Sequence, residues 1–320
     1  MSQSLRHLSH RLHGIHAATV TPLDDRRRLH EADLAAHLGR VAGTPGIRGV
    51  LVNGHAGEGP LLEPAEKRRV VELARATVAP AQFVCAGVSA ESTAAAQREA
   101  EAAAAAGADG ILVFPPFAWA LGHDTEMVVA HHAAIAAACG LPLVLYRAPI
   151  SAGRLAYSLD SLAALAALPA VIAVKEGSWE VAAYEEVRRM LNSVAPRIAV
   201  LGSGDEHLLT SYLIGSEGSQ VSLAAIVPEL IVALFDAAAA GAWARARALH
   251  ERIYPLAVAI YRRQPAYLAT VRLKACLHQM GRICEPLAKL PMRQLRDDER
   301  QDLVGALRQT LEGGEALASG

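Results

Sequence analysis

A lysine follows a short apolar run, and its position suggests amine chemistry. Residues 171–174 are Val-Ile-Ala-Val, and Lys175 comes next. Such a run predicts a strand buried on both faces, where a lysine without a partner is rare. The chain has only four lysines, and arginine supplies the remaining positive charge. Because arginine neither loses its proton nor forms an imine, a lysine here favours nucleophilic catalysis. The alternative is a lysine that reaches solvent from a strand end.

A tyrosine ends the preceding predicted strand, residues 143–146. Neighbouring strands lie about 4.8 Å apart, so inward-pointing Tyr146 and Lys175 would bring a phenol close to an amine. Burial among apolar residues can lower a lysine pKa from about 10.4 by roughly three units, which frees the amine to attack a ketone. The imine would then act as an electron sink, and Tyr146 would move protons. The alternative is a core tyrosine with a satisfied hydroxyl.

Two glycine-rich turns follow other predicted strands. Residues 54–59, Gly-His-Ala-Gly-Glu-Gly, can turn backbone N–H groups toward a carboxylate. Residues 202–206, Gly-Ser-Gly-Asp-Glu, place two acids where they would cap a helix or bind substrate hydroxyls. A plain strand-to-helix loop is the alternative for each turn.

The elements that must position these groups alternate regularly along the chain. Short apolar runs and longer alanine-rich amphipathic runs predict eight strand–helix units from residue 14 onward, hence a closed (β/α)8 TIM barrel. No Gly-x-Gly-x-x-Gly follows the first strand, which disfavours a dinucleotide fold. The expected strands are 14–22, 49–54, 83–88, 110–114, 143–146, 171–175, 198–201 and 218–223. We expect an N-terminal extension over 1–13, a barrel over 14–226 and a C-terminal helical region over 227–320, packed on the barrel.

Composition narrows the class of protein. Of 320 residues, 52% are hydrophobic and 20% charged, and the net charge is −1, which gives no electrostatic case for nucleic acid or an acidic membrane. The first 13 residues lack the apolar stretch of a signal peptide, and no run reaches the ~18 apolar residues of a membrane span. Four cysteines without a Cys-x-x-Cys pair predict reduced core thiols and no zinc site. We therefore expect a cytoplasmic protein without metal or cofactor.

Several motifs together resemble one known family. The chain carries Gly-His-Ala-Gly-Glu at 54–58, Pro-Pro at 115–116, Tyr146, Val-Lys-Glu at 174–176 and Ser-Gly-Asp at 203–205, with Arg-Leu-Lys-Ala at 272–275. Their order and spacing resemble the dihydrodipicolinate synthase and N-acetylneuraminate lyase family. The resemblance implies a TIM barrel with a C-terminal helical extension, a Schiff-base lysine at Lys175 and an adjacent tyrosine at Tyr146. It also implies pyruvate or a related 2-oxo acid as substrate, and a homo-oligomer, tetramer or dimer.

Departures from the family pattern concern the substrate. The family's Gly-Thr-Thr-Gly-Glu loop supplies two hydroxyls, whereas this chain has His55 and Ala56 there. The relay tyrosine of the synthase is replaced by Phe117, and its carboxylate-binding arginine by Ser151, with Arg147 and Arg154 nearby. The acidic pair at 205–206 resembles the lyase branch, which binds a polyhydroxylated chain. The predicted substrate-binding residues are His55, Ala56, Gly204, Asp205, Glu206 and Ser222.

Three functions remain open from the sequence. The first is a Schiff-base-forming aldolase or dehydratase that acts on a 2-oxo acid, a class that includes 2-oxo acids derived from sugar acids. The second is dihydrodipicolinate synthase itself, which the missing arginine and hydroxyls disfavour. The third is a barrel that keeps the lysine but serves as a ligand-binding or regulatory protein.

Overall fold

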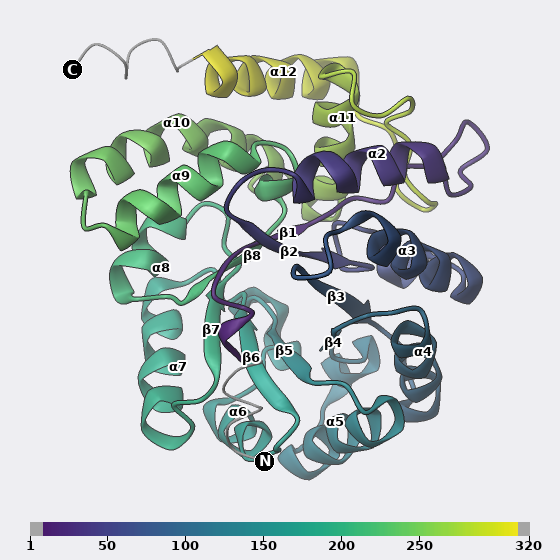
Figure 1. The fold of residues 1–320 in the computed structure, drawn as a ribbon, viewed down its shortest axis with the longest axis vertical. Helices are drawn as coiled ribbons and strands as arrows, with labels where there is room; N and C mark the ends of the chain where they lie inside the picture. Colours follow the sequence, from purple (N-terminus) through teal and green to yellow (C-terminus); the bar gives the residue numbers. More distant parts are fainter. Residues whose placement is uncertain (1–8, 313–320) are drawn as a thin grey trace.

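The computed structural model describes residues 9–312 and contains a closed barrel of eight parallel strands, paired in the order β1 to β8. The barrel forms the centre of the molecule, and helices surround it (Figure 1). The predicted TIM barrel is thus confirmed. The strands are β1 (Gly14–Ala18), β2 (Ile47–Val52), β3 (Phe83–Val88), β4 (Gly110–Val113), β5 (Leu143–Arg147), β6 (Val171–Glu176), β7 (Ala199–Gly202) and β8 (Gly218–Val221).

Helices begin where local sequence supplies caps. Ser92 accepts the Ala95 N–H at the start of α4, and Asp124 accepts the Met127 N–H at the start of α5. The α-helices are α2 (Glu31–Ala42), α3 (Pro64–Thr77), α4 (Thr93–Ala105), α5 (Thr125–Cys139), α6 (Leu159–Ala166), α7 (Val181–Val194), α8 (Leu208–Ile214), α9 (Pro228–Ala239), α10 (Trp243–Tyr261), α11 (Ala269–Gln279) and α12 (Asp297–Glu312). Short 3-10 helices are η1 (Gly59–Leu61), η2 (Phe117–Leu121), η3 (Ile150–Leu155), η4 (Leu223–Ala225) and η5 (Ala266–Leu268).

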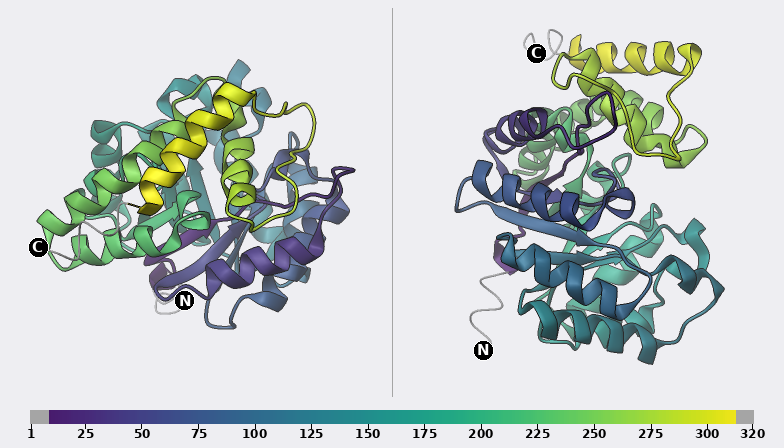
Figure 2. Two further views of the ribbon diagram at one scale, coloured as in Figure 1. Left: turned by 90° about the horizontal axis from the view of Figure 1, so that it is seen from above. Right: turned by 90° about the vertical axis from the view of Figure 1, so that its right-hand side faces the viewer.

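The C-terminal helices form a layer at one side of the barrel (Figure 2). Helix α10 packs on α9, α11 and α12, whereas α9 packs on β1 and η4. Helix α9 therefore serves as the eighth barrel helix, and the helices beyond the barrel begin with α10. The sequence-based boundary at residue 227 places α9 with the tail, because an amphipathic pattern does not reveal which neighbour it covers.

Two predicted strands are shorter in the structure. The first ends at Ala18 instead of residue 22, and the eighth ends at Val221 instead of residue 223. In both places the chain stays buried beyond the end of the strand, in a loop or at the start of a 3-10 helix. The predicted strands are therefore too long, because burial continues beyond the last paired residue.

The segment before β1 closes the amino end of the barrel. Leu12 is fully buried in the same cluster as the inward-facing Phe83 and Cys85. Arg11 and Arg75 both donate to the Asp109 carboxylate, at 3.1 and 3.0 Å. The predicted extension 1–13 thus begins to pack by residue 9, while its residues 1–8 lie outside the described residues.

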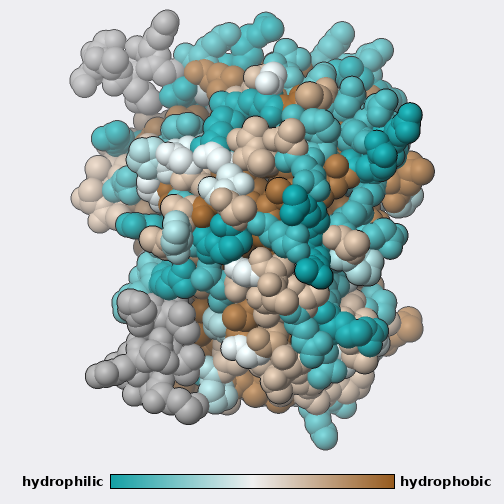
Figure 3. All heavy atoms as spheres, turned by 45° about the vertical axis from the view of Figure 1, so that its right-hand side comes forward, coloured by the Kyte–Doolittle hydropathy of each residue, from teal (hydrophilic) through white to brown (hydrophobic). Residues whose placement is uncertain are grey.

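Surface properties agree with the composition. Hydrophilic and hydrophobic residues are interspersed on the face shown in Figure 3. Over residues 9–312, no helix is both long and apolar enough to cross a membrane. All four cysteines are free, but Cys284 is exposed, so the prediction of core thiols is wrong for it. Cys284 lies after α11, and its thiol contacts the Asp33 carboxylate.

Candidate active site

Lys175 and Tyr146 lie side by side at the carboxyl end of the barrel. They are register partners on β6 and β5, each the penultimate residue of its strand. The Lys175 Nζ atom lies 5.9 Å from the centroid of the Tyr146 ring. The predicted approach of an amine to a phenol is therefore present.

The surroundings of Lys175 favour the neutral amine. Residues 171–174 are buried, and Lys175 is half-buried at the mouth of the barrel. Desolvation lowers the pKa of Lys175 to about 8, although the negative charge of Asp205 acts in the opposite direction. Roughly one molecule in ten is then neutral at pH 7, against about one in two thousand for a free lysine. The amine can thus act as a nucleophile near neutral pH.

Tyr146 is held within an aromatic cluster. Its ring centroid lies 4.8 Å from that of Phe114 and 5.4 Å from that of His55, with the His55 ring edge-on. The His55 and Phe114 rings are 4.4 Å apart. Burial, and then the charge of Glu176, raise the pKa of Tyr146, so that the phenol keeps its proton at neutral pH.

His55 stands on the loop 53–59, which has an unusual backbone. Asn53 and Glu58 adopt positive φ angles of 54° and 59°. His55 as a residue is exposed, yet desolvation and then the charge of Lys175 lower its pKa, so the imidazole is neutral at pH 7. Within residues 9–312 the amides of residues 55–57 donate no backbone hydrogen bond, and Ala56 is half-buried. The loop can therefore offer N–H donors to a carboxylate.

A polar cluster lies on the other side of Lys175. The buried Asp205 accepts the Leu223 N–H at 2.8 Å and contacts the Tyr261 hydroxyl. Ser222 Oγ lies 2.5 Å from the same hydroxyl. Burial raises the pKa of Asp205 to about 6, while the Leu223 N–H and Lys175 oppose the shift. Carboxylate, hydroxyl and phenol thus converge from two strand ends and from α10.

Glu206 does not join this cluster. It is buried and forms an ion pair with Arg262, the residue after α10. Gly204, half-buried, lies between β7 and this acidic pair. Asp205 and Glu206 were predicted as a pair toward substrate; the structure directs Asp205 toward the Lys175 side and Glu206 toward the tail.

The arginines near the synthase position are engaged elsewhere. Arg147 is buried and donates to the Glu176 carboxylate and the Ala183 carbonyl, both at 3.0 Å. Arg154 donates to the Leu121 carbonyl at 2.8 Å from an exposed position. Neither side chain is poised toward Lys175.

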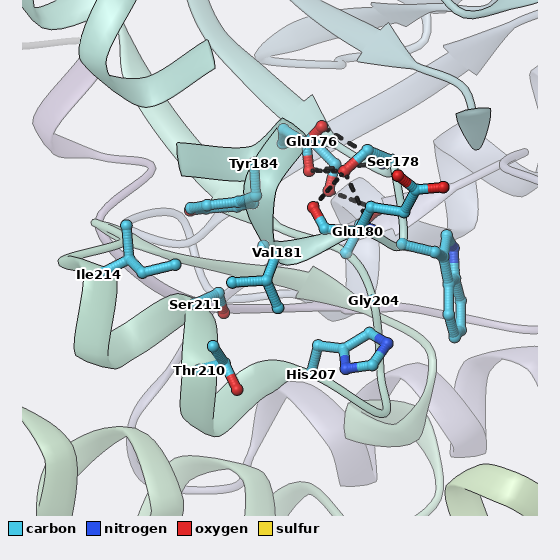
Figure 4. A pocket seen from close by; sticks show the side chains of 13 residues that line it. Glu176, Ser178, Glu180, Val181, Tyr184, Gly204, His207, Thr210, Ser211 and Ile214 are labelled. Atoms are coloured by element: carbon cyan, nitrogen blue, oxygen red, sulfur yellow. Dashed lines mark hydrogen bonds between the residues drawn. The ribbon is translucent and has the colours of Figure 1, made fainter. Parts of the chain in front are cut away.

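A pocket lies beside the site, between the loops that follow β6 and β7 (Figure 4). Glu176, Ser178, Gly204 and His207 are among its lining residues. Ser178 bridges the Glu176 carboxylate and the Glu180 carbonyl, at 3.0 and 3.2 Å. Lys175 does not line this pocket, which is therefore a neighbour of the site and not its floor.

Two contributions were missed by sequence reasoning. Tyr261 ends α10, within the predicted C-terminal helical region, and no motif around it indicates that its hydroxyl reaches Asp205. Glu58 was grouped with the substrate loop, but its carboxylate is paired with Lys274 of α11. No group of three or more His, Cys, Asp or Glu side chains in the described part of the chain could hold a metal ion.

Comparisons with known proteins agree with this geometry. Residues 11–310 match the model of the dihydrodipicolinate synthetase family. An uncharacterized DapA-like lyase of Halobacterium salinarum is 36% identical over 296 residues, covering 92% of this chain and 93% of that protein. A 4-hydroxy-tetrahydrodipicolinate synthase of a Synechococcus species is 36% identical over 299 residues, covering 92% and 94%.

Solved structures share the fold. The dihydrodipicolinate synthase of Agrobacterium tumefaciens superposes with a TM-score of 0.84 at 26% identity, covering 95% of this chain and 99% of that one. YagE of Escherichia coli, a prophage protein of the same family solved in complex with pyruvate, gives a TM-score of 0.86 at 22% identity, covering 94% and 99%.

Proposed function

This chain belongs to the dihydrodipicolinate synthetase family of lyases, and on that basis we propose that Lys175 forms an imine with pyruvate or a related 2-oxo acid. The observation that carries the proposal is the pairing of Lys175 with Tyr146 at the barrel mouth, together with the lowered pKa of the lysine.

The proposed chemistry begins with attack by the neutral Nζ on the keto carbon, after which water leaves and an iminium forms. The iminium accepts the electron pair released when a carbon–carbon bond breaks or when the adjacent carbon loses a proton. Tyr146, protonated at neutral pH, gives a proton to the leaving oxygen and takes one back in the reverse step. No metal or organic cofactor enters these steps.

The loop 53–59 is the proposed carboxylate site. Its unpaired amides at residues 55–57 and the neutral His55 ring supply N–H donors close to Tyr146. Hydrogen bonds to a charged group are worth about 1.5–3 kcal/mol each. In this arrangement His55 and Ala56 replace the two hydroxyl-bearing residues of the related loop without removing the backbone donors.

The rest of the substrate is proposed to be a hydroxylated chain. Asp205, Ser222 and Tyr261 offer one carboxylate and two hydroxyls next to Lys175, a set suited to alcohols and not to a second carboxylate. This supports an aldolase or dehydratase acting on a sugar-acid-derived 2-oxo acid. Glu206 is left out of the binding set because Arg262 already occupies it.

A second candidate is 4-hydroxy-tetrahydrodipicolinate synthase, the activity after which the Synechococcus relative is named. That activity needs a cation to bind a second carboxylate, and no arginine near Lys175 is available for this. Arg147 binds the Glu176 carboxylate, and Arg154 binds the Leu121 carbonyl. Ser151, exposed at the expected arginine position, does not replace it. The polar cluster therefore favours the first candidate.

Reductive trapping tests the proposal. Incubation with pyruvate and borohydride should give a stable adduct that peptide mass spectrometry locates on Lys175, and Lys175→Ala or Lys175→Arg should give none. In D₂O the same chain should exchange the methyl protons of pyruvate for deuterium, a partial reaction that needs no second substrate. A chain that binds pyruvate without adduct or exchange would be a silent ligand-binding barrel.

A further inference from the structure

Helix α11 reaches across the molecule to the loop 53–59. The hydroxyl of Thr270 donates to the His55 carbonyl at 3.1 Å. One turn later, the Lys274 ammonium is paired with the Glu58 carboxylate. These contacts join residues 215 and 216 positions apart, so a helix outside the barrel holds the loop at both His55 and Glu58.

The ion pair is fully buried, and each of its two groups has a further hydrogen-bond partner. Both side chains are 0% exposed. The second carboxylate oxygen of Glu58 accepts the Lys289 N–H at 2.5 Å, and Lys274 donates also to the Leu287 carbonyl at 2.8 Å. Buried ion pairs add little net stability because desolvation offsets their attraction, but they fix geometry closely when every partner is present. The main effect of this ion pair is therefore on the position of the loop 53–59.

The loop needs such a constraint. Glu58 has a φ of 59°, a left-handed conformation that is strained for a residue other than glycine. Strained backbone persists where surrounding contacts over-determine it. Three residues earlier, the His55 ring lies 5.4 Å from the Tyr146 ring and 4.4 Å from Phe114. A shift of the loop would therefore move a direct neighbour of the phenol.

We propose that Thr270, Glu58 and Lys274 are positioning residues of the active site. They hold the loop 53–59 so that His55 packs on Tyr146 and the loop amides face the carboxylate site. Proton transfer at Tyr146 then depends on α11. The inference rests on the proposed function of Lys175 and Tyr146, and it assigns to the C-terminal helices a part in catalysis beyond covering the barrel.

The test uses the full chain and separates imine formation from proton transfer. Thr270→Val keeps the shape of the side chain and removes its hydroxyl. Deuterium exchange into pyruvate should fall by about 10- to 100-fold, the range expected when a catalytic group is displaced by a fraction of an ångström to one ångström. At saturating pyruvate, the yield of trapped adduct should stay close to that of the parent, and so should the unfolding midpoint. Thr270→Ser, which restores a hydroxyl, should recover most of the exchange.

Thr310→Val is the matched control. Thr310 lies in α12, is fully buried, and its hydroxyl has no hydrogen-bond partner in the described residues. The same substitution there should leave exchange at the parental rate. A second variant, Glu58→Gln combined with Lys274→Met, removes both buried charges together and should fold, form the adduct and lose exchange as Thr270→Val does.

The same measurements distinguish a failure of the α11 proposal from a failure of the proposed function of Lys175. If the parent chain forms no adduct, the proposed function fails. If the parent forms the adduct and exchanges, but Thr270→Val and the double variant both exchange at the parental rate, the inference about α11 is overturned while Lys175 keeps its role. Equal losses in Thr270→Val and Thr310→Val would likewise overturn it, because the effect would be general destabilisation.

Discussion

Lys175 is subject to two opposing influences, and their balance sets the pH at which it can react. Burial lowers its pKa, whereas the charge of Asp205 raises it, and the result is a value of about 8. Asp205 itself titrates near 6 because it is buried. Between these two values the site contains a charged aspartate and a mixture of charged and neutral lysine.

The first residue-scale prediction concerns this balance. Only the neutral amine attacks, so the initial rate of pyruvate trapping should rise with pH and level off above about 8. Asp205→Asn removes the charge that favours the ammonium form, so the pKa of Lys175 should fall and the rising limb should move to lower pH. Trapping rates measured from pH 5 to 10 check this. A limb that stays in place would mean that Asp205 and Lys175 are not electrostatically coupled.

Tyr146 provides a second prediction at this scale. Tyr146→Phe preserves the packing against Phe114 and His55 but removes the hydroxyl. The adduct with Lys175 should still form, and exchange of the pyruvate methyl protons should fall by roughly 100- to 10,000-fold. A loss of less than about threefold would assign proton transfer to another group.

At the scale of elements, the barrel seam between β1 and β8 depends on glycine. A Cβ at Gly218 would lie 2.1 Å from the carbonyl oxygen of Gly14 on the paired strand. Because backbone would have to move, Gly218→Ala should lower the free energy of unfolding by more than about 3 kcal/mol. Urea denaturation followed by circular dichroism measures this change.

Gly305 supplies the contrast for that measurement. It is exposed within α12, and a Cβ there meets nothing within 4 Å. Gly305→Ala should therefore be neutral or stabilise by up to ~1 kcal/mol, since alanine favours helix. Similar effects of the two substitutions would contradict the steric account of the seam.

The elements themselves were largely predictable from the sequence, because each strand and helix carries its own periodic pattern. The proximity of Lys175 and Tyr146 was predictable for the same reason: each closes a local apolar run, and parallel pairing of the two strands makes them neighbours. The contact of Glu206 with Arg262 and that of Tyr261 with Asp205 were not predicted, because both depend on the packing of α10 on the barrel. Contacts between distant segments leave no trace in local spacing.

At the scale of the whole molecule, the Glu58–Lys274 ion pair links the barrel to the C-terminal helices, so substitutions in it should change the free energy of unfolding. Replacing either partner alone, Glu58→Gln or Lys274→Met, leaves a buried charge without its counterpart and should cost about 3–5 kcal/mol. Replacing both should cost less than the sum of the single changes. A double-mutant cycle in denaturant measures the coupling, and additive effects would show that the two groups do not interact.

The loop 53–59 and α11 lie far apart along the chain, so they are synthesised at different times. A ribosome releases the chain from its N-terminus, so all eight strands and Lys175 emerge before Thr270 and Lys274. A nascent or truncated chain that stops short of α11 carries the nucleophile and lacks both contacts that shape the loop beside it. With α11 as a positioning element, the reactive amine is made early, and the site around it is completed only after α11, residues 269–279 of 320, has been translated.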